Sequence, residues 1–541
     1  MTQMLRARWL GRVPYREAEA LQRAIHERCD DQYLLLQEHP HVYTLGSRAD
    51  AAHVLRDPAS VGAELVVADR GGDVTYHGPG QLVGYPIVSL AAWRAGQRDV
   101  VAYVRKLESV LIAALADFGI EANAVPGFTG VWVGDRKIAA IGVRVARGRT
   151  RHGFALNVNT DLSMFEHIVP CGIRDRGVTS MAREIGHSID MRRVVDRIVA
   201  RFAELFEATE IDRQDVAWRI SVQDVAPFTR GAARDVPVRL LGRLAAAGVE
   251  SAVDPAGRRP EWMKVRAHFD EQYLGLKRLV RDLELHTVCE EAGCPNIYEC
   301  WADRTATFMI LGDRCTRACG FCMVDTRKPL VVDDDEPRRV ADAVVALGLA
   351  HVVITCVARD DLPDGGAAIF AATVEAVRAA STSTAVELLI SDMKGDAASL
   401  AAVFAARPDV LNHNLETVAR LQRAVRPSAG YARSLSVLAR AKHAGLVTKS
   451  GLILGMGETA EEVMAALRDL RAVGVDLVTI GQYLRPSAQH LPVARWWTPD
   501  EFDAFGAAAR AMGFAHVEAG PLVRSSYHAR RGIDQLARAS G

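Results

Sequence analysis

Six of the nine cysteines in this chain of 541 residues lie within one short stretch. They form two groups of three, spaced C-x4-C-x5-C and then C-x3-C-x2-C: Cys289, Cys294 and Cys300, followed by Cys315, Cys319 and Cys322. Thiolates at such spacing bind soft metal ions, and three per group favour iron–sulfur clusters over structural zinc, which takes four protein ligands. A cluster on the second group would leave one iron open to a substrate or cofactor. Structural zinc remains the alternative, whereas disulfides would need an oxidising compartment, which nothing in the sequence indicates.

The residues around both groups carry a family resemblance. Cys315-Thr-Arg-Ala-Cys319-Gly-Phe-Cys322 resembles the signature of the radical S-adenosylmethionine enzymes. Cys289-Glu-Glu-Ala-Gly-Cys294-Pro-Asn-Ile-Tyr-Glu-Cys300-Trp is similar to the auxiliary-cluster motif of the lipoyl synthases, and the likeness continues to Arg524-Ser525-Ser526-Tyr527. The resemblance implies S-adenosyl-L-methionine and two 4Fe-4S clusters as cofactors. It assigns Cys315, Cys319 and Cys322 to the radical cluster, and Cys289, Cys294, Cys300 and Ser526, rather than Ser525, to the auxiliary cluster.

The lipoyl synthase resemblance also implies a reaction. The open iron binds the amino and carboxylate groups of S-adenosylmethionine, and an electron from a donor such as ferredoxin or flavodoxin cleaves the sulfonium to a 5′-deoxyadenosyl radical. The radical abstracts hydrogen from unactivated carbons, which no acid or base side chain can do. The auxiliary cluster then supplies sulfur at carbons 6 and 8 of an octanoyl chain on a carrier lysine.

Length and composition limit the class of protein. A chain of 541 residues exceeds one ordinary core, and we expect two large domains. Lys+Arg and Asp+Glu balance at 66 each, which argues against a whole-chain nucleic-acid or anionic-membrane partner. The N-terminus has no apolar region typical of a signal peptide, and the most apolar run, Val344 to Ala358, is too short to span a bilayer. We therefore expect a cytoplasmic protein.

The second half of the sequence alternates short β-rich runs with helical stretches. The runs are Thr307–Leu311, His351–Thr355, Val386–Ile390, Asp409–Asn412, Lys449–Leu454 and Asp476–Ile480. Six such units predict a parallel sheet wound right-handed. The resemblance makes this α/β sheet a partial (β/α)6 barrel of the radical S-adenosylmethionine type, with its active site at the carboxyl ends of the strands.

The first half reads as an α+β domain, with helices predicted at Tyr15–Cys29 and Val100–Phe118. Its densest polar signal is a glycine-rich stretch from Arg70 to Gln81, containing Arg70-Gly71-Gly72-Asp73-Val74-Thr75-Tyr76-His77. So much glycine beside an arginine and a histidine suits backbone that approaches a ligand, although a plain glycine-rich hairpin is an equal alternative. Later come Lys137, Ala140-Ile141-Gly142, Gly153-Phe154-Ala155 and Val169-Pro170-Cys171-Gly172.

This ordered set resembles the octanoyltransferases, which move an octanoyl group from acyl carrier protein to a lysine of lipoyl-carrier domains and are related in fold to biotin and lipoate ligases. By the resemblance Cys171 is the nucleophile and Lys137 its acid–base partner. A thiolate exchanges readily with a thioester, and a nearby ammonium can lower its pKa and shuttle protons. The alternatives are a buried filler cysteine and a salt-bridged surface lysine. The resemblance also places Arg70 to His77, Ala140 to Gly142 and Gly153 to Ala155 around the acyl pocket.

The partners implied are octanoyl-acyl carrier protein and the lipoyl-carrier domains of 2-oxoacid dehydrogenases and of the glycine cleavage H protein. Between the halves, residues 213–258 loosen into Pro, Gly, Ala and Arg, which predicts a linker with one short helix near Val238–Ala247. The predicted domains are therefore 1–212 and 259–541. Cys356 stands where the lipoyl synthases usually have serine, and we interpret it as a packing residue.

The sequence predicts a bifunctional enzyme that joins octanoyl transfer to radical sulfur insertion. One rival hypothesis makes the first half an ATP-dependent lipoate or biotin ligase. A second, non-enzymatic hypothesis is an iron–sulfur storage or scaffold protein with an inert acyl-binding module.

Overall fold

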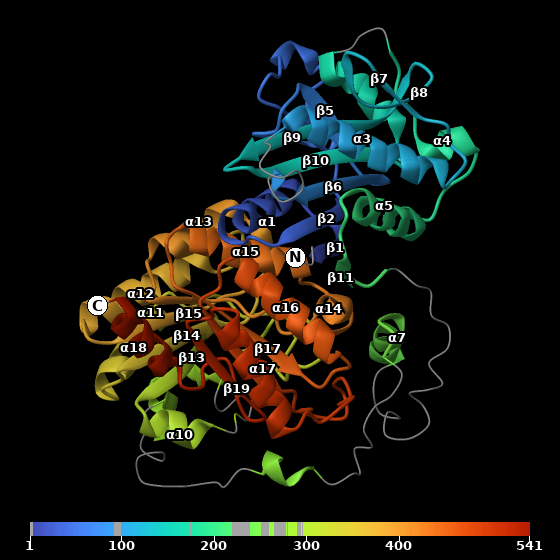
Figure 1. The fold of residues 1–541 in the computed structure, drawn as a ribbon. Helices are drawn as coiled ribbons and strands as arrows, with labels where there is room; N and C mark the ends of the chain where they lie inside the picture. Colours follow the sequence, from blue (N-terminus) through green and yellow to red (C-terminus); the bar gives the residue numbers. More distant parts are fainter. Residues whose placement is uncertain are drawn as a thin grey trace. The chain divides into compact units, whose positions relative to one another are not determined.

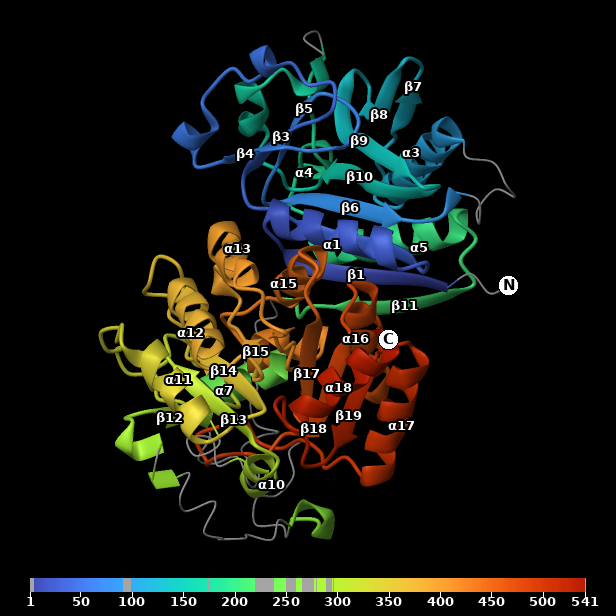
Figure 2. The ribbon, with the colours of Figure 1, turned by 90° about the vertical axis from the view of Figure 1, so that its left-hand side faces the viewer.

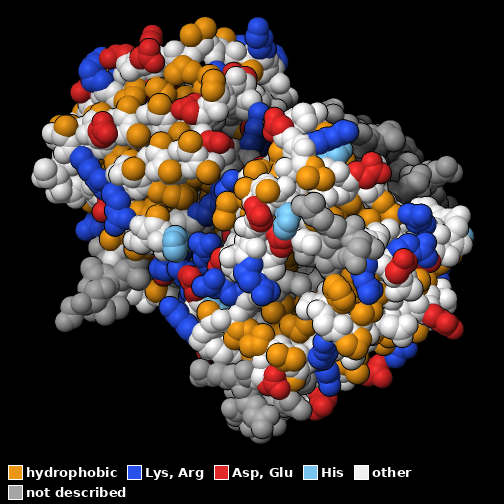
Figure 3. Space-filling model, turned by 90° about the horizontal axis from the view of Figure 1, so that it is seen from above, with side chains coloured by type: hydrophobic (Ala, Val, Ile, Leu, Met, Phe, Trp, Pro, Cys, Tyr) orange, Lys and Arg blue, Asp and Glu red, His pale blue; other side chains and the backbone are white. Residues whose placement is uncertain are grey.

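The computed structural model of the chain describes residues 4–90, 99–172, 176–218, 238–249, 259–264, 277–278, 280–288, 294 and 296–540. The chain forms two compact units, Met1–Trp218 and Arg219–Gly541 (Figure 1). Among the described helices, none combines the length and the apolar character that a membrane crossing requires. Acidic and basic side chains are both scattered over the face of the molecule seen in Figure 3.

The first unit is built on a mixed eight-stranded sheet. Its strands, in spatial order, are β11 (Glu210–Asp215), β1 (Met4–Arg12), β2 (Gln32–Glu38), β6 (Gln81–Ile87), β10 (Arg149–Asn157), β9 (Arg136–Ala146), β8 (Phe128–Val133) and β7 (Asn123–Val125). Strand β1 pairs in parallel with both β11 and β2, whereas β2, β6, β10, β9, β8 and β7 pair antiparallel in turn. Because β6, β9 and β10 are neighbours, stretches that lie far apart in the sequence meet on one surface.

A smaller sheet and several helices complete this unit. The small sheet has the order β4 (Glu64–Val67), β3 (Val42–Leu45) and β5 (Val74–His77). Helix α1 (Tyr15–Arg28) packs on β6 and β10, and α3 (Val100–Ala116) packs on α5 (Met191–Leu205) and on β8 to β10, so the two predicted helices are confirmed. The remaining short helices are η1 (Ala51–His53), η2 (Pro58–Val61), η3 (Leu162–His167), η4 (Pro170–Gly172) and α4 (Met181–Ile185).

The second unit contains the predicted parallel sheet. Its strands lie side by side in chain order: β12 (His286–Thr287), β13 (Thr305–Ile310), β14 (His351–Cys356), β15 (Ala385–Leu389), β16 (Val410–Asn412), β17 (Thr448–Leu454), β18 (Leu477–Gln482) and β19 (His516–Gly520). All pairs from β13 to β19 are parallel, and only β12 pairs antiparallel. The six predicted strands are confirmed within one or two residues at their ends, and β12 and β19 are additional.

Helices follow the strands and cover the outside of this sheet (Figure 2). They are α11 (Glu336–Ala346), α12 (Ala367–Ala380), α13 (Ala397–Ala405), α15 (Tyr431–His443), α16 (Ala460–Ala472) and α17 (Pro499–Ala511). Shorter elements are α7 (Val238–Ala246), η5 (Glu261–Met263), α10 (Ile297–Ala302), η6 (Met393–Gly395), η7 (Ala419–Leu421) and α14 (Gln422–Val425), and α18 (Ala529–Ser540) ends the chain. The α/β partial barrel predicted from the sequence is confirmed.

Local sequence signals fix the ends of these helices. Helices α16 and α17 each start with a capping box, in which Thr459 pairs with Glu462 and Thr498 with Glu501.

The strands and helices of the second unit share one hydrophobic core. Apolar side chains of β13 to β15, including Phe308, Ile354 and Leu388, pack there against the surrounding helices.

Helix α7, which the sequence predicted inside the linker, packs against α14 of the second unit. Its Leu240 and Leu244 are buried. Arg420 donates hydrogen bonds to the carbonyls of Ala247, at the end of α7, and of Gly457. The predicted helix is therefore confirmed, and it forms part of the barrel's own packing.

A layer of buried polar side chains crosses the sheet of the second unit. The Lys449 ammonium lies 3.0 and 3.1 Å from the two carboxylate oxygens of Glu387, and Asn412 donates to the same carboxylate at 2.9 Å. Glu387 and His351 are completely buried. Burial alone would raise the pKa of Glu387, but Lys449 and His351 oppose it and hold the pKa at about 2. Glu387 therefore stays charged, and its stability contribution is lost only as the pH falls from about 5 towards 2.

Removing the Lys449 ammonium should show how strongly the barrel depends on this pair. We expect Lys449→Met to destabilise the second unit by about 3–5 kcal/mol, because Glu387 would remain buried without its cation. The double variant Glu387→Leu, Lys449→Met removes both charges and should recover most of the loss. Urea unfolding, followed by tryptophan fluorescence, measures the stability of both variants. Equal stability of the single and double variants would show that the buried Glu387 charge does not depend on the Lys449 ammonium.

Candidate active sites

The first unit contains a cavity of about 650 Å³ between β5, β6, β9 and β10. Its size is that of a small-molecule site. The predicted pocket residues that line it are Arg70, Gly71, Gly72, Asp73, Thr75, His77, Ala140, Ile141, Gly142, Gly153, Phe154 and Ala155. Gly142 and Gly153 sit where a Cβ atom would meet the backbone carbonyls of Gly71 and Gly84, so the close approach of β9 and β10 to their neighbours requires glycine there.

Two residues of the predicted pocket point elsewhere. Val74 and Tyr76 belong to the apolar cluster formed with Tyr43 and Phe165. Strand β5 explains this, because successive side chains of a strand point to opposite faces, and Thr75 and His77 take the cavity side. The family resemblance had assigned every residue from Arg70 to His77 to the pocket, because a motif does not take into account that alternate strand residues face opposite sides.

The cavity wall is held by buried polar contacts. The Arg70 guanidinium, 7% exposed, donates to the Thr44 hydroxyl at 2.8 and 3.1 Å and to the Thr44 carbonyl at 2.6 Å. His77 lies 2.8 Å from Gln81 Oε1, and His152 lies 2.7 Å from Asp69 Oδ1. Burial lowers the pKa of both imidazoles, so both histidines are neutral at pH 7. The charged side chains that reach the cavity from these predicted stretches are Arg70, Asp73 and Lys137.

Lys137 projects from β9 into the cavity and is 8% exposed. Its ammonium lies 4.8 Å from the centroid of the Trp132 ring, a cation–π contact. Its backbone N–H donates to the Gly177 carbonyl at 2.9 Å, and its carbonyl accepts from Thr179 at 3.0 Å. The alternative of a surface lysine is therefore excluded.

Cys171 lies in the single turn η4, next to β5. The N–H of Gly172 closes this turn on the Val169 carbonyl at 3.1 Å, and the N–H of Val169 donates to the His53 carbonyl at 2.8 Å. Gly172 has φ +72°, and a Cβ atom there would lie 2.9 Å from Asp73 Oδ2, an atom of a cavity-lining residue. The turn that carries Cys171 is therefore fixed directly beside the cavity.

The sequence reasoning missed several cavity residues. They are Tyr15, Arg48, Val83, Tyr85, Val104, Gly127, Phe128, Thr129, Val143 and His152. Val83 and Tyr85 are alternate residues of β6 and therefore lie on the same face of the strand. This alternation was the sequence signal that could have indicated both as cavity residues. Tyr15 and Val104 come from helices, and no local pattern indicates which helical residues face a cavity.

In the second unit, Cys315, Cys319 and Cys322 lie in the loop that follows β13, at the carboxyl edge of the parallel sheet. All three side chains are half-buried. The Cys315 sulfur accepts backbone N–H groups of Arg317 and Ala358 at 3.4 and 3.3 Å. Burial raises the pKa of Cys319, and raises that of Cys322 to about 12, with the neighbouring cysteines adding to the effect.

Three cysteines of one loop, one of them accepting two N–H groups, are a donor set that fits an iron–sulfur cluster. In the part of the chain that the structure describes, no three His, Cys, Asp or Glu side chains converge on a position for a single ion. A cluster is bound through separate irons, and N–H groups directed at cysteine sulfur are among the features that tune it. The Cys315 sulfur receives two such groups.

The first cysteine group lies beside the predicted Arg-Ser-Ser-Tyr segment. Cys294 precedes α10 and Cys300 lies on it, whereas Cys289 is outside the described residues. Burial raises the pKa of the Cys294 thiol and lowers that of the Arg524 guanidinium, and the opposite charges of the two groups oppose both shifts. Tyr527 donates to Glu299, the neighbour of Cys300, at 3.1 Å. Two segments more than 200 residues apart therefore meet, and they carry the residues predicted for the auxiliary cluster.

Cys356 ends β14 and packs against the apolar core of the second unit. Burial raises the pKa of its thiol to about 12, and Cys315 contributes in the same direction. This environment is that of a packing residue, as the sequence suggested.

Comparison with known proteins assigns each unit to a class. The profile of the lipoyl protein ligase A/B catalytic domain matches residues 14–203, and that of the radical SAM superfamily matches residues 309–470. The profile of the N-terminal domain of lipoyl synthase matches residues 249–294. The chain thus joins a lipoyl protein ligase A/B-type catalytic domain to a radical SAM domain.

The second unit can be placed more closely. Lipoyl synthase of Mycobacterium leprae (strain TN) is 57% identical over 295 residues, which cover 54% of this chain and 94% of that protein. Lipoyl synthase of Mycobacterium tuberculosis (strain ATCC 25177 / H37Ra) is 58% identical over 293 residues, with the same coverage. A solved structure of lipoate-protein ligase A bound with ATP covers 40% of this chain and 88% of its own, at 20% identity and a TM-score of 0.34. Through its second unit the chain belongs to the lipoyl synthase family.

Proposed function

We propose that the chain catalyses two successive steps of lipoate assembly: transfer of an octanoyl group to a carrier lysine, then insertion of two sulfur atoms at carbons 6 and 8. The observation that carries the proposal is the union in one chain of a lipoyl synthase with a cavity bordered by the Cys171 turn and Lys137. The product of the first reaction would be the substrate of the second.

In the first unit, Cys171 attacks the thioester carbonyl of octanoyl-acyl carrier protein, and the carrier thiol leaves. The acyl-enzyme then passes the octanoyl group to the amine of a lysine on a lipoyl-carrier domain, and the Cys171 thiol is restored. Lys137 transfers the protons: its ammonium stabilises the Cys171 thiolate and gives a proton to the leaving thiolate, and the amine so formed later accepts a proton from the attacking lysine. The cavity shields the acyl chain from water.

In the second unit, Cys315, Cys319 and Cys322 would hold the radical SAM cluster, and Cys289, Cys294, Cys300 and Ser526 the auxiliary cluster. When bound, the two clusters and S-adenosylmethionine supply hydrogen abstraction and sulfur. The chain itself supplies the thiolates, the N–H groups that point to Cys315, and the contact of Glu299 with Tyr527 that keeps Ser526 near Cys300.

The partners proposed are octanoyl-acyl carrier protein, the lipoyl-carrier domains of 2-oxoacid dehydrogenases, the glycine cleavage H protein, and an electron donor such as ferredoxin or flavodoxin. The rival for the first unit is an ATP-dependent ligase, since the matching profile covers ligases A and B together. A cysteine turn fixed beside the cavity favours the transferase, because a ligase that activates its acid with ATP needs no cysteine nucleophile. AMP release from ATP and free octanoate would favour the ligase.

The first unit is tested by two substitutions. We expect Cys171→Ser to abolish octanoyl transfer, while the second unit still acts on pre-octanoylated carrier. Lys137→Ala should slow transfer by about 10²–10⁴-fold, the usual effect of losing an acid–base group. Mass spectrometry of the carrier measures both. Undiminished transfer by Cys171→Ser would end its assignment as nucleophile, and a rate for Lys137→Ala close to wild type would end that of Lys137.

A glycine pair tests whether the position of the Cys171 turn matters. Gly172→Ala places a methyl group against Asp73 and should slow transfer by about 100-fold, the cost of a small misplacement of a reacting group. Gly186→Ala is the control: its φ of +90° carries the same backbone penalty, but nothing lies within 4 Å of its Cβ position. Transfer by Gly186→Ala should stay near wild type. Equal rates for the two variants would show that the turn tolerates displacement.

The clusters are tested separately. Replacing Cys315, Cys319 and Cys322 by alanine should stop cleavage of S-adenosylmethionine. Replacing Cys289, Cys294 and Cys300 should leave formation of 5′-deoxyadenosine but deliver no sulfur to the carrier. Chromatography of 5′-deoxyadenosine and mass spectrometry of the carrier distinguish the outcomes. If the second replacement also stopped cleavage in protein with its other cluster intact, this division of roles would be wrong.

A further inference from the structure

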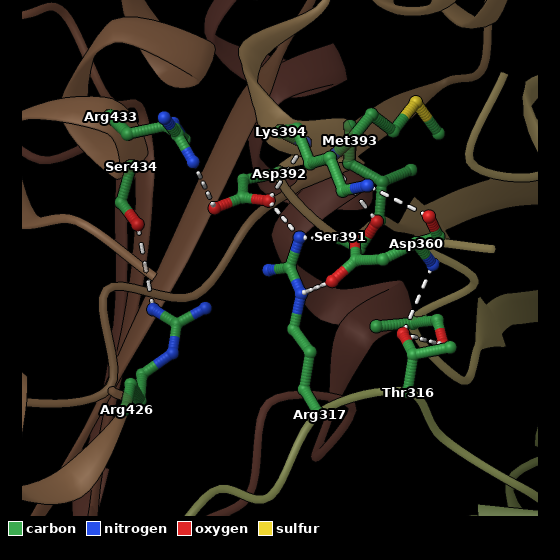
Figure 4. A network of polar contacts seen from close by, with 12 residues as sticks. Thr316, Arg317, Asp360, Ser391, Asp392, Met393, Lys394, Arg426, Arg433 and Ser434 are labelled. Atoms are coloured by element: carbon green, nitrogen blue, oxygen red, sulfur yellow. Dashed lines mark hydrogen bonds and ion pairs between the residues drawn. The ribbon is translucent and has the colours of Figure 1, made fainter. Parts of the chain in front are cut away.

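Arg317, between the first two cysteines of the radical SAM motif, is held by two carboxylates from different strand ends (Figure 4). Its Nε and Nη2 donate to the two oxygens of Asp360, both at 2.8 Å, and Nη2 also donates to Asp392 Oδ1 at 2.6 Å. Asp360 follows β14, and Asp392 follows β15. The cysteine loop that follows β13 is thereby tied to the ends of the next two strands in the sheet, β14 and β15.

The contacts are shielded from water. Arg317 is 7% exposed and Asp392 is completely buried, whereas the Asp360 side chain is 25% exposed. Burial would lower the pKa of Arg317, but the two carboxylates outweigh it and raise the pKa. Arg433 also approaches, with Nη1 3.9 Å from Asp392 Oδ2. Such a buried group of charges depends on every member, because removal of one leaves the others uncompensated.

The segment that presents Asp392 is strained. Met393 and Lys394 have φ values of +43° and +52°, which residues other than glycine seldom adopt. Asp392 supports this shape by accepting the N–H of Lys394 at 3.1 Å, and the N–H of Gly395 donates to the Asp392 carbonyl at 2.7 Å. The Lys394 ammonium donates to the Asp360 carbonyl at 2.7 Å, so the two anchors of Arg317 are also joined to each other.

The cysteine loop has further contacts on the same side. The N–H and hydroxyl of Thr316 donate to the Ala358 carbonyl at 2.9 and 2.8 Å, and the Thr316 hydroxyl accepts the N–H of Asp360 at 3.0 Å. Since Ala358 also donates to the Cys315 sulfur, the ion pairs of Arg317 and the environment of Cys315 form one network.

We propose that Arg317 is a positioning residue for the radical SAM cluster: through Asp360 and Asp392 it holds the cysteine loop in its binding shape before iron and sulfide arrive. The inference rests on the proposed role of Cys315, Cys319 and Cys322 as cluster ligands. It adds that the loop is formed by the protein rather than by the metal, and that a guanidinium is needed to form it.

The requirement for arginine follows from geometry. A guanidinium is a planar fork that can meet one carboxylate with two nitrogens and reach a second carboxylate with the same group. A lysine ammonium is a point charge, which keeps the charge but loses the fork. Arg317→Lys therefore separates the need for a fixed shape from the need for a positive charge.

The experiment uses the full chain with Cys289, Cys294 and Cys300 replaced by alanine, so that reconstituted iron reports on the second cysteine group alone. In this background we compare Arg317→Lys and Asp360→Asn with the matched control Arg420→Lys. Arg420 makes the same kind of two-nitrogen ion pair with Glu462, at 2.6 and 2.8 Å, and donates its other hydrogen bonds to the carbonyls of Ala247 and Gly457, which lie outside the cysteine loop. The measurements are the thermal unfolding midpoint, the rate at which a chelator removes iron, and the change in the EPR spectrum of the reduced protein on addition of S-adenosylmethionine.

We expect Arg317→Lys to release iron about 10–100-fold faster than the control, the usual cost of losing a partner that orients metal ligands. Its EPR response to S-adenosylmethionine should be weakened, while its unfolding midpoint stays near that of Arg420→Lys. Asp360→Asn leaves Arg317 paired with Asp392 and should have a smaller effect in the same direction. If Arg317→Lys does not fold, the iron release and EPR response of Asp360→Asn test the proposal instead.

Iron release and an EPR response equal to the control in every folded variant would overturn the proposal. The same result together with normal cleavage of S-adenosylmethionine would leave the proposed function intact. Absence of S-adenosylmethionine cleavage in the parent background and in all variants would instead contradict the proposed function itself.

Discussion

In a parallel sheet every strand ends at the same edge, and the second unit depends on this constraint. The loops after β13, β14 and β15 carry the cysteine motif, Asp360 and Asp392; Arg317 of the motif is 43 residues from Asp360 and 75 from Asp392 in the sequence. They meet because β13, β14 and β15 are neighbours in register. The segment after β19 reaches the first cysteine group at the same edge, through Arg524 and Tyr527. This geometry therefore assembles the predicted site of the radical SAM cluster, and it also positions the segment after β19 that contacts α10.

Both units use a buried guanidinium to shape a predicted site. Arg70 binds the backbone and hydroxyl of Thr44 and so fixes one wall of the first cavity. Arg317 binds two carboxylates and so fixes the cysteine loop. In each case a fork of donors satisfies several acceptors at once, which lysine cannot do.

Much of this architecture could be predicted from the sequence, because apolar runs separated by helical stretches indicate parallel strands directly. The short strand β12 and the strand β19, whose residues are all half-buried, lack such a run and were not predicted. The spacing of the cysteines singled them out, and glycine density singled out the stretch from Arg70 to Gln81, whereas Gly142 and Gly153 were assigned to the pocket by the family resemblance. Val74 and Tyr76 were misplaced because a motif gives residue order, whereas the side that each residue faces depends on the strand. The pairing of Arg317 with Asp392 could not be predicted, since it depends on which loops the sheet brings together.

Helix α7 lies within the stretch 213–258 that the sequence predicted as a linker. Because α7 packs on α14 and Arg420 donates to the carbonyl of Ala247, directly after α7, the helix belongs to the second unit. A cut or deletion that removed α7 would therefore not merely separate the two units, since it would also take the buried Leu240 and Leu244 out of the packing of the second unit.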